Sequence, residues 1–428
     1  MRSIGRWSLA ALMINSIIGS GVFGLPSIIL RQLGPAGPAA WVASAMFAGV
    51  VMACFAEVSS RFTQAGGPYL YARVAFGRFV GILIAWFVWA VRLFSAAANT
   101  NLFVVYLAEV WPAAHEFVPR LLVLTLLIGV LAAVNFRGVQ AGTQVSNVFT
   151  VAKLSSLALF IIIGGAFLLA RHQPMHLTLL PKGEASSLGD SFLLLVFAYG
   201  GFEGALLPLG EAKHPRRDAP LALAVALGTC AVVYTLVQVV VMGALPYGTQ
   251  TDRPLAEAAR VFLGNAGAGL VTLAGLLSTY GYLASQTLNL PRLTFALAEH
   301  EDFPRVFAAV HPRFRTPYVS ILVFAVLLWV LSLAGSFRWN AVLSAIARLF
   351  YYGVICAALL VLRRRDPGAA WFRLPAAQVF AVSGIVISIL LVSGIQRGSA
   401  AVIAAVALIA FANWLWARNR KTAPAPAT

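Results

Sequence analysis

The stretch that decides the fold is Asn15-Ser-Ile-Ile-Gly-Ser-Gly-Val-Phe-Gly-Leu-Pro26, inside an apolar run from Leu9 to Leu30. A run of this length can cross a lipid bilayer as one helix. However, Gly19 and Gly21 flank Ser20, and such close glycines weaken a helix where lipid cannot satisfy free N–H and C=O groups. The half-helix after the break has free N–H groups and a positive dipole end. Gly19 to Gly21 therefore predict a carboxylate site at mid-membrane depth.

The same stretch has a second interpretation, as a packing face for another helix. Ser16, Ser20 and Gly24 are spaced by four, which places three small residues on one side of a helix. A second interrupted run, from Phe192 to Gly210, contains Phe197-Ala-Tyr-Gly-Gly-Phe-Glu-Gly204. Two broken helices in corresponding positions of two halves indicate a transporter binding site. The second break therefore favours the binding-site interpretation.

The composition indicates an integral membrane protein. The chain has 428 residues, of which 60% are hydrophobic and 11% charged, too few polar groups to cover a soluble globule of this size. The net charge of +17 is carried by short basic clusters between apolar runs, so we expect cytoplasmic loops and no nucleic-acid partner. The three cysteines are scattered in apolar runs and predict neither a disulfide nor a metal site.

Apolar runs long enough to span a membrane predict an all-α protein with twelve transmembrane helices. Their approximate ranges are 8–30, 37–60, 79–108, 120–136, 144–170, 189–210, 219–245, 266–298, 317–335, 338–362, 376–396 and 399–417. We expect the first run to be a retained helix, because its Gly-Ser-Gly core and its length are unlike those of a secretory signal peptide.

The basic residues predict the orientation of the chain. With the N-terminus inside, the inner loops and tails hold 20 lysines and arginines and the outer loops hold 8. Cytoplasmic loops carry the excess of positive charge, so we expect a multi-pass protein of the cytoplasmic (inner) membrane with both termini in the cytoplasm.

The helix count predicts an internal repeat within a single transporter domain, 1–428. The first five and the next five spans form two halves, 1–170 and 189–362, and an odd number of spans in each half inverts the second relative to the first. Two helices within 376–417 lie outside the repeat. The tail, 422–428, alternates alanine and proline and is predicted to be disordered.

Ionisable side chains inside the spans are candidates for function, because an unpaired charge in a membrane is costly. They are Glu57, Arg92, Lys153, Glu203 and Arg348. Glu203 follows the second break by three residues, and it is either a coupling or gating group or an internal strut bonded to freed N–H groups. Glu57 is four residues before Arg61, which predicts a helix-surface ion pair.

Lys153 lies in the fifth span with no acid nearby in the sequence. It either loses its proton on desolvation, provides a fixed cation where a sodium ion would otherwise sit, or extends its ammonium to the inner surface. The sequence does not distinguish the roles of Arg92 and Arg348.

Catalytic patterns are missing from the sequence. All six histidines fall in predicted loops or at span ends, and there is no His-Glu-x-x-His, Gly-x-Ser-x-Gly or P-loop pattern. We therefore expect no metal, no cofactor and no enzymatic or ATP-driven activity.

The motifs resemble those of the amino acid–polyamine–organocation permeases, in family order and over most of the first ten helices. The matching segments are Ile18-Gly-Ser-Gly-Val-Phe-Gly-Leu-Pro26, Ala65-Gly-Gly-Pro-Tyr69, Phe76-Gly77, Phe197-Ala-Tyr-Gly-Gly-Phe-Glu203, Gly210-Glu-Ala-Lys-His-Pro-Arg-Arg217, Arg292-Leu-Thr-Phe-Ala-Leu-Ala298, Phe303-Pro304 and His311-Pro-Arg-Phe-Arg-Thr-Pro317.

The resemblance implies a leucine-transporter-type fold, a 5+5 inverted repeat with broken helices 1 and 6 plus two extra helices. It implies that the substrate carboxylate binds backbone groups of Gly19, Ser20 and Gly21, and that the amino group binds the carbonyls of Ile17, Phe197, Ala198 and Gly200.

Two single residues acquire roles through the same resemblance. Phe197 is similar to the gating aromatic of the family, and Lys153 to a lysine that occupies a sodium site in sodium-independent members. Two departures affect gate geometry and selectivity: Pro291 replaces a small polar residue, and Arg92 adds a charge to the third span.

The resemblance and the breaks together predict a sodium-independent secondary amino acid transporter that works by alternating access, as a proton symporter or an exchanger. An exporter of neutral amino acids is the alternative within transport. An ion channel would need a continuous polar pore, whereas the polar residues within the spans cluster around two breaks. A membrane-embedded enzyme would need a catalytic constellation. The particular amino acid is not predicted, because backbone groups recognise features that all amino acids share.

Overall fold

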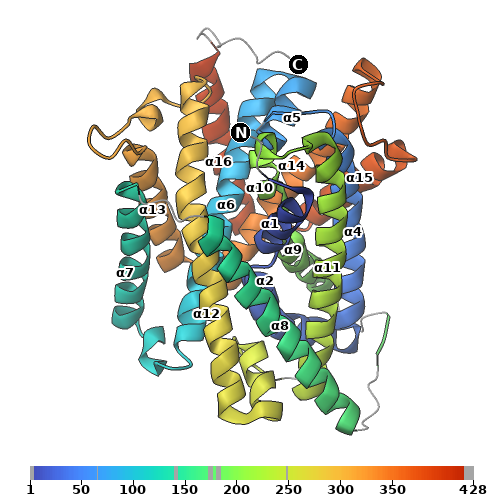
Figure 1. Cartoon of the computed structure of the whole chain (residues 1–428), viewed down its shortest axis with the longest axis vertical. Helices are drawn as coiled ribbons and strands as arrows, with labels where there is room; N and C mark the ends of the chain where they lie inside the picture. Colours follow the sequence, from blue (N-terminus) through green and yellow to red (C-terminus); the bar gives the residue numbers. More distant parts are fainter. Residues whose placement is uncertain are drawn as a thin grey trace.

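The structure is a computed structural model that describes residues 4–64, 66–138, 143–171, 177–179, 185–246 and 249–418. Within these ranges every regular element is a helix, apart from one isolated bridge between Ile4 and Ala212 (Figure 1). Ala65, part of a motif quoted above, and the predicted disordered tail, 422–428, lie outside the described residues.

Most of the α-helices overlap a predicted apolar run, whereas the helix Gly67–Phe76 lies between two of the runs. They are α1 (Arg6–Ile17), α2 (Ser20–Gly24), α3 (Pro26–Leu33), α4 (Gly37–Ser59), α5 (Gly67–Phe76), α6 (Arg78–Leu107), α7 (Phe117–Phe136), α8 (Thr143–Arg171), α9 (Ala185–Tyr199), α10 (Phe202–Ala205), α11 (Pro215–Ala244), α12 (Pro254–Glu299), α13 (Tyr318–Ala334), α14 (Phe337–Arg365), α15 (Ala377–Ser393) and α16 (Arg397–Ala417). Short 3₁₀ turns at Gly34–Ala36, Pro112–His115, Leu207–Glu211 and Arg305–Ala308 join some of them.

The described residues contain nine helical segments that are long and apolar enough to cross a membrane, and α13 and α15 are shorter apolar helices. Large apolar side chains point away from the protein on the outer helices, for example Leu126, Ile162, Leu390 and Leu408. Apolar surface of this extent is stable against lipid rather than water. The chain is therefore a membrane protein with multiple membrane-spanning helices.

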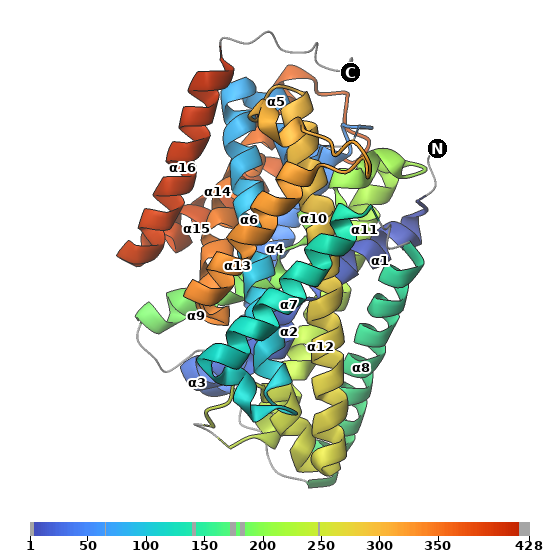
Figure 2. The ribbon, with the colours of Figure 1, turned by 90° about the vertical axis from the view of Figure 1, so that its left-hand side faces the viewer.

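The breaks lie at the centre of the helix bundle. α6 and α14 pack along each other, and α1 packs on α11, which also packs on α4. Figure 2 shows α16 on one side of the molecule and α8 on the other, with α6 and α10 between them. The interrupted helices are thus surrounded by protein, where a break in membrane backbone is tolerated.

α12 differs from the predicted span 266–298. It begins at Pro254, and Gly264 has a φ of 66° that kinks it. Pro291 lies inside the helix and cannot donate to the carbonyl of Thr287 four residues earlier. The side-chain amide of Asn135 in α7 donates to that carbonyl at 2.5 Å. Pro291 is therefore accommodated by a donor from a neighbouring helix.

Candidate functional site

The first break separates α1 from α2. Ile18 has an extended backbone conformation, and Gly19 has φ −123° and ψ −138°, so the helix stops at Ile17 and restarts at Ser20. Leu25 N donates to Gly21 O at 3.0 Å and Ile29 N to Leu25 O at 2.9 Å. Helical bonding therefore continues from α2 into α3, and the predicted half-helix after the break is present.

The second break separates α9 from α10. Gly201 has a φ of 116°, a left-handed conformation that glycine adopts without steric cost. A side chain at Gly201 would collide with the Ser16 carbonyl of α1, so the close approach of the two breaks also requires glycine. The backbone N–H of Gly201 donates to Glu203 Oε2 at 2.9 Å. The two interrupted helices are thus in direct contact.

A small cavity lies between the two breaks. Every residue predicted to bind substrate lines it: Ile17, Gly19, Ser20, Gly21, Phe197, Ala198 and Gly200. The remaining lining residues are Ser16, Ser95, Asn99, Tyr282 and Arg348. Its free volume is about 10 Å³, roughly that of one water position, so binding an amino acid requires its walls to move apart.

The predicted carbonyl acceptors already accept hydrogen bonds from protein donors. Tyr234 OH of α11 lies 3.1 Å from Ile17 O and 3.2 Å from Ala198 O. Arg348 Nη1 donates to Phe197 O at 3.3 Å. A carbonyl oxygen has two lone pairs, so each can accept a second hydrogen bond. Sequence analysis names Arg348 as a candidate without a role and does not indicate Tyr234; both donors come from helices distant in the chain.

Lys153 is buried and bonded to the first break. Its ammonium donates to Asn15 Oδ1 at 3.0 Å, to Asn15 O at 3.4 Å and to the carbonyl of Ile18. The side chain therefore joins α8 to α1 and does not extend to the inner surface. Ile18 O is one of the carbonyls that the break removes from helical bonding.

Glu203 forms a buried network with α14. Its Oε1 atom accepts from Arg348 Nε at 3.2 Å and from Tyr351 OH at 2.6 Å. Together with the bond from Gly201, the carboxylate holds the second break against α14. This geometry is that of the strut named above, and one of its partners, Arg348, also lines the cavity.

Arg92 lies one turn before Ser95 on α6, on the same helix face as Ser95 and Asn99. Its Nη1 donates to Gln286 Oε1 of α12 at 3.2 Å, and its Nε has no hydrogen-bond partner among the described residues. The side chain reaches the second break, because a Cβ at Gly204 would lie 2.5 Å from Arg92 Nη2.

Glu57 and Arg61 pair at 3.2 Å as predicted, but both side chains are buried and not on the helix surface. The carboxylate also accepts from Arg363 Nε and Nη2, both at 2.7 Å, and from Leu374 N at 2.8 Å. It therefore joins α4 to α14 and to the segment before α15, away from the cavity.

A second ionic cluster lies between the loop after α12 and the start of α6. Asp302 accepts from Arg78 Nε at 2.9 Å and also from Arg73 and Tyr69. Burial and the neighbouring carboxylate raise the pKa of Tyr69 well above its usual range, so its hydroxyl stays protonated and donates. This cluster ties α5 and α6 to the end of α12.

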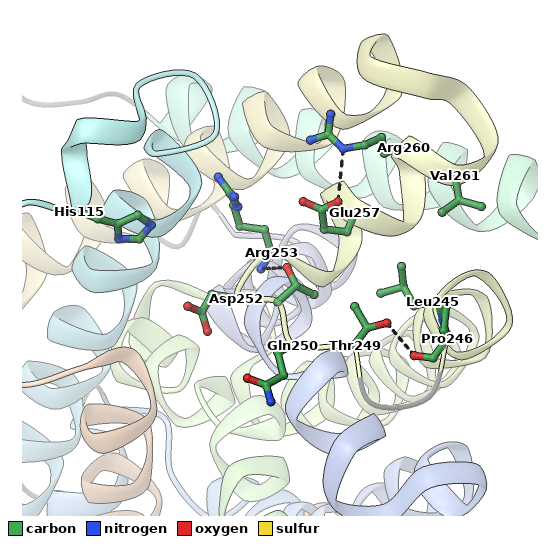
Figure 3. A pocket seen from close by; sticks show the side chains of 11 residues that line it. His115, Leu245, Pro246, Thr249, Gln250, Asp252, Arg253, Glu257, Arg260 and Val261 are labelled. Carbon is green, nitrogen blue, oxygen red and sulfur yellow. Dashed lines mark hydrogen bonds and ion pairs between the residues drawn. The ribbon is translucent and has the colours of Figure 1, made fainter.

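A larger pocket of about 650 Å³ lies at the opposite end of α12 (Figure 3). Arg253 pairs with Glu109 at 2.9 Å, and Arg260 pairs with Glu109 and with Glu257. These arginines already have acidic partners, and none of the residues predicted to bind substrate lines this pocket.

Comparison with known proteins identifies a family and several relatives of this chain. The family described as amino acid permease matches residues 4–414. The methylthioribose transporter of Bacillus subtilis (strain 168) is 26% identical over 393 residues, covering 87% of this chain and 84% of that transporter. An uncharacterised transporter of Mycobacterium tuberculosis (strain CDC 1551 / Oshkosh) is 29% identical, covering 85% and 81%.

Cationic amino acid transporter 4 of Mus musculus is 28% identical over 388 residues, covering 85% of this chain and 60% of that protein. These relatives are transporters, and the family match extends over nearly the whole chain. The chain therefore belongs to the amino acid permease family, within the amino acid–polyamine–organocation superfamily.

Proposed function

We propose that this transporter is a sodium-independent secondary amino acid transporter that works by alternating access, as a proton symporter or an exchanger. The observation that carries the proposal is the cavity at the junction of two broken helices, lined by the backbone of both breaks. Free N–H groups at the start of α2 suit a carboxylate, and carbonyls at the ends of α1 and α9 suit an ammonium group. These are the two groups that all amino acids share.

The proposal includes the architecture of a twelve-span 5+5 inverted repeat, with halves 1–170 and 189–362 and two further helices within 376–417. The contact between the α1–α2 break and the α9–α10 break supports it, because these breaks occupy corresponding positions in the two halves. α1 starts and α16 ends in the upper half of Figure 2, as expected for two termini on one side. We propose that this side is the cytoplasm.

The Asp302 cluster and the Ile4 bridge belong to the same proposal, as contacts that close the cytoplasmic side. Ile4 N donates to Glu211 O at 3.1 Å and Lys213 N to Ile4 O at 2.9 Å, which places the N-terminal segment beside the end of the 3₁₀ turn that follows α10. Opening toward the cytoplasm requires such contacts to separate while the cavity widens. Saturable, exchange-stimulated uptake of a labelled amino acid by proteoliposomes tests the proposed function.

Phe197 is proposed to gate the cavity. Its ring lies 6.1 Å from the ring of Phe337 at the start of α14, and the side chain is 7% exposed. We expect Phe197→Ala to reduce the uptake rate by about tenfold while changing the dissociation constant by less than about threefold, because a gate acts on the occlusion step.

Uptake and equilibrium binding should be measured on the same Phe197→Ala preparation, with Phe411→Ala on α16 as the control. Phe411 is 45% exposed and its ring packs against Phe79 and Trp414, outside the lining of the cavity, so its replacement should affect neither quantity. An equal loss of binding and of uptake in Phe197→Ala would make the residue a cavity wall rather than a gate.

A further inference from the structure

We infer that the cavity selects an amino acid whose side chain carries a negative charge, such as a carboxylate. The inference rests on the proposed function and adds the class of substrate to it. Its basis is an excess of buried cationic groups around the two helix breaks.

Arg348 places a guanidinium group in the wall of the cavity. The residue is 2% exposed, and its Nε bonds to Glu203 while its Nη1 bonds to Phe197 O. An added Cβ at Gly200 would overlap the guanidinium, so the group packs directly against the second break. A planar guanidinium is well suited to a carboxylate because its N–H groups match the two oxygen atoms.

Arg92 brings a second guanidinium to the same five-residue segment, against Gly204. Its Nη1 bonds to a neutral amide, that of Gln286, and its buried Nε lacks a partner within the described ranges. Arg348 packs against Gly200 and Arg92 against Gly204, so the Glu203 carboxylate belongs to a segment with an arginine at each end. Glu203 forms its salt bridge with Arg348 and interacts with Arg92 only at longer range, so Arg92 has no salt bridge of its own in the described part of the chain.

Lys153 adds a third cation on the other side of the first break. Its ammonium donates to the carbonyls of Asn15 and Ile18 and to the Asn15 amide oxygen, all of which are neutral. With Lys153 protonated, three cationic side chains thus accompany one carboxylate, Glu203, among the described residues around the cavity.

The charge of the substrate changes the excess of positive charge around the cavity. A zwitterion with a neutral side chain adds no net charge, a cationic amino acid increases the excess, and an acidic amino acid reduces it by one. Uncompensated charge is costly in a low-dielectric interior, so the cavity electrostatics favour the acidic substrate. Ser20 lines the cavity, and its hydroxyl, which has no hydrogen-bond partner among the residues that the structure describes, is a free donor for an anionic group. The cationic substrate named for the mouse relative is therefore disfavoured here.

The test compares ligands of matched shape on the purified full-length protein. L-glutamate and L-glutamine, and likewise L-aspartate and L-asparagine, differ in the side-chain carboxylate, and L-lysine provides the opposite charge. We expect an acidic amino acid to bind about tenfold or more tightly than its amide, the factor expected for one charge-assisted hydrogen bond. Equal or tighter binding of the amides or of lysine would overturn the inference and leave the proposed function standing. If no amino acid bound, both would fail.

Variants assign the selectivity to the arginines. Arg92→Gln removes an excess charge without leaving an acid unpaired, so the variant should fold. Arg348→Gln combined with Glu203→Gln removes both members of the buried pair and avoids an isolated carboxylate. In each variant we expect the ratio of glutamate affinity to glutamine affinity to fall to about threefold or less.

Arg338→Gln is the matched control. Arg338 pairs with Asp190 at 3.1 Å, and both side chains are partly exposed, so its loss should leave the preference for glutamate unchanged. The assignment of selectivity to these arginines would be overturned if both cavity variants kept the preference for glutamate over glutamine. This outcome requires that their melting temperatures without ligand equal that of the unmodified protein.

Discussion

Replacing Lys153 with alanine is expected to reduce the rate of amino acid uptake by about a hundredfold. The side chain is 3% exposed, and its ammonium is bonded to the carbonyls of Asn15 and Ile18 at the first break. Each buried acceptor left without a donor costs about 1–3 kcal/mol. A cost of about 2.7 kcal/mol to one state of the transport cycle corresponds to a hundredfold change in rate.

Ser155→Ala is the control for this variant. Ser155 lies on the same helix, is exposed, and bonds to the nearby Ala152 carbonyl, so its loss should not change uptake. The initial rate of radiolabelled amino acid uptake by proteoliposomes measures both variants. Uptake by Lys153→Ala within about threefold of the control would contradict a coupling role.

The same account of Lys153 predicts that replacing sodium with choline leaves uptake by the unmodified protein unchanged. A fixed ammonium supplies the charge that a sodium ion would otherwise provide. Stimulation by an inward proton gradient would favour the version in which the ammonium loses its proton, and its absence would favour an exchanger. A strict requirement for sodium would refute both versions.

Gly19→Val is expected to weaken amino acid binding by about a hundredfold, and Gly19→Ala by a smaller factor. A Cβ at Gly19 would lie 3.7 Å from Asn99 Oδ1 and 3.7 Å from the Tyr282 ring, which is ordinary van der Waals contact. The protein should therefore fold, but the new side chain occupies space beside the backbone that approaches the carboxylate. Gly21 is a poorer test, because its Cβ would lie 3.0 Å from Ala198.

A thermal-shift titration measures binding in these variants, because a ligand stabilises the protein in proportion to occupancy. Gly228→Ala on α11 is the control, since no atom of the described residues outside its own turn of helix lies within 4 Å of the added methyl group. An amino acid amide, which lacks the α-carboxylate, should fail to compete in the unmodified protein. If Gly19→Val bound amino acids with full affinity and the amide competed, the assignment of the substrate carboxylate to this site would be wrong.

The sequence predicts both helix breaks, because paired glycines in an apolar run weaken helical bonding at a depth where lipid offers no hydrogen bonds in exchange. It also predicts the cavity residues that belong to the breaks. Ser95 and Asn99 were missed, since the rotation of an unbroken helix is set by its neighbours. A signal for them was nevertheless present: with Arg92, they follow at intervals of three and four residues and so share one face of α6.

The pairing of charges was less predictable than the breaks. Glu203 and Arg348 are 145 residues apart, and only the packing of α10 against α14 brings them together. Lys153 was a candidate because of its solitary position and the family resemblance, and the structure adds that its ammonium bonds to the first break. The donors to the cavity carbonyls, such as Tyr234, lie on a continuous helix without any local sequence signal.

The central claim, an amino acid carrier that works by alternating access, is tested most directly by exchange in proteoliposomes. Vesicles containing the purified protein are preloaded with an unlabelled amino acid that the protein binds, and entry of the labelled form is followed. We predict uptake that saturates with external substrate, is accelerated by the internal substrate, and is lost in Gly19→Val. Entry that rises linearly with concentration and ignores the internal substrate would show a channel and contradict the account.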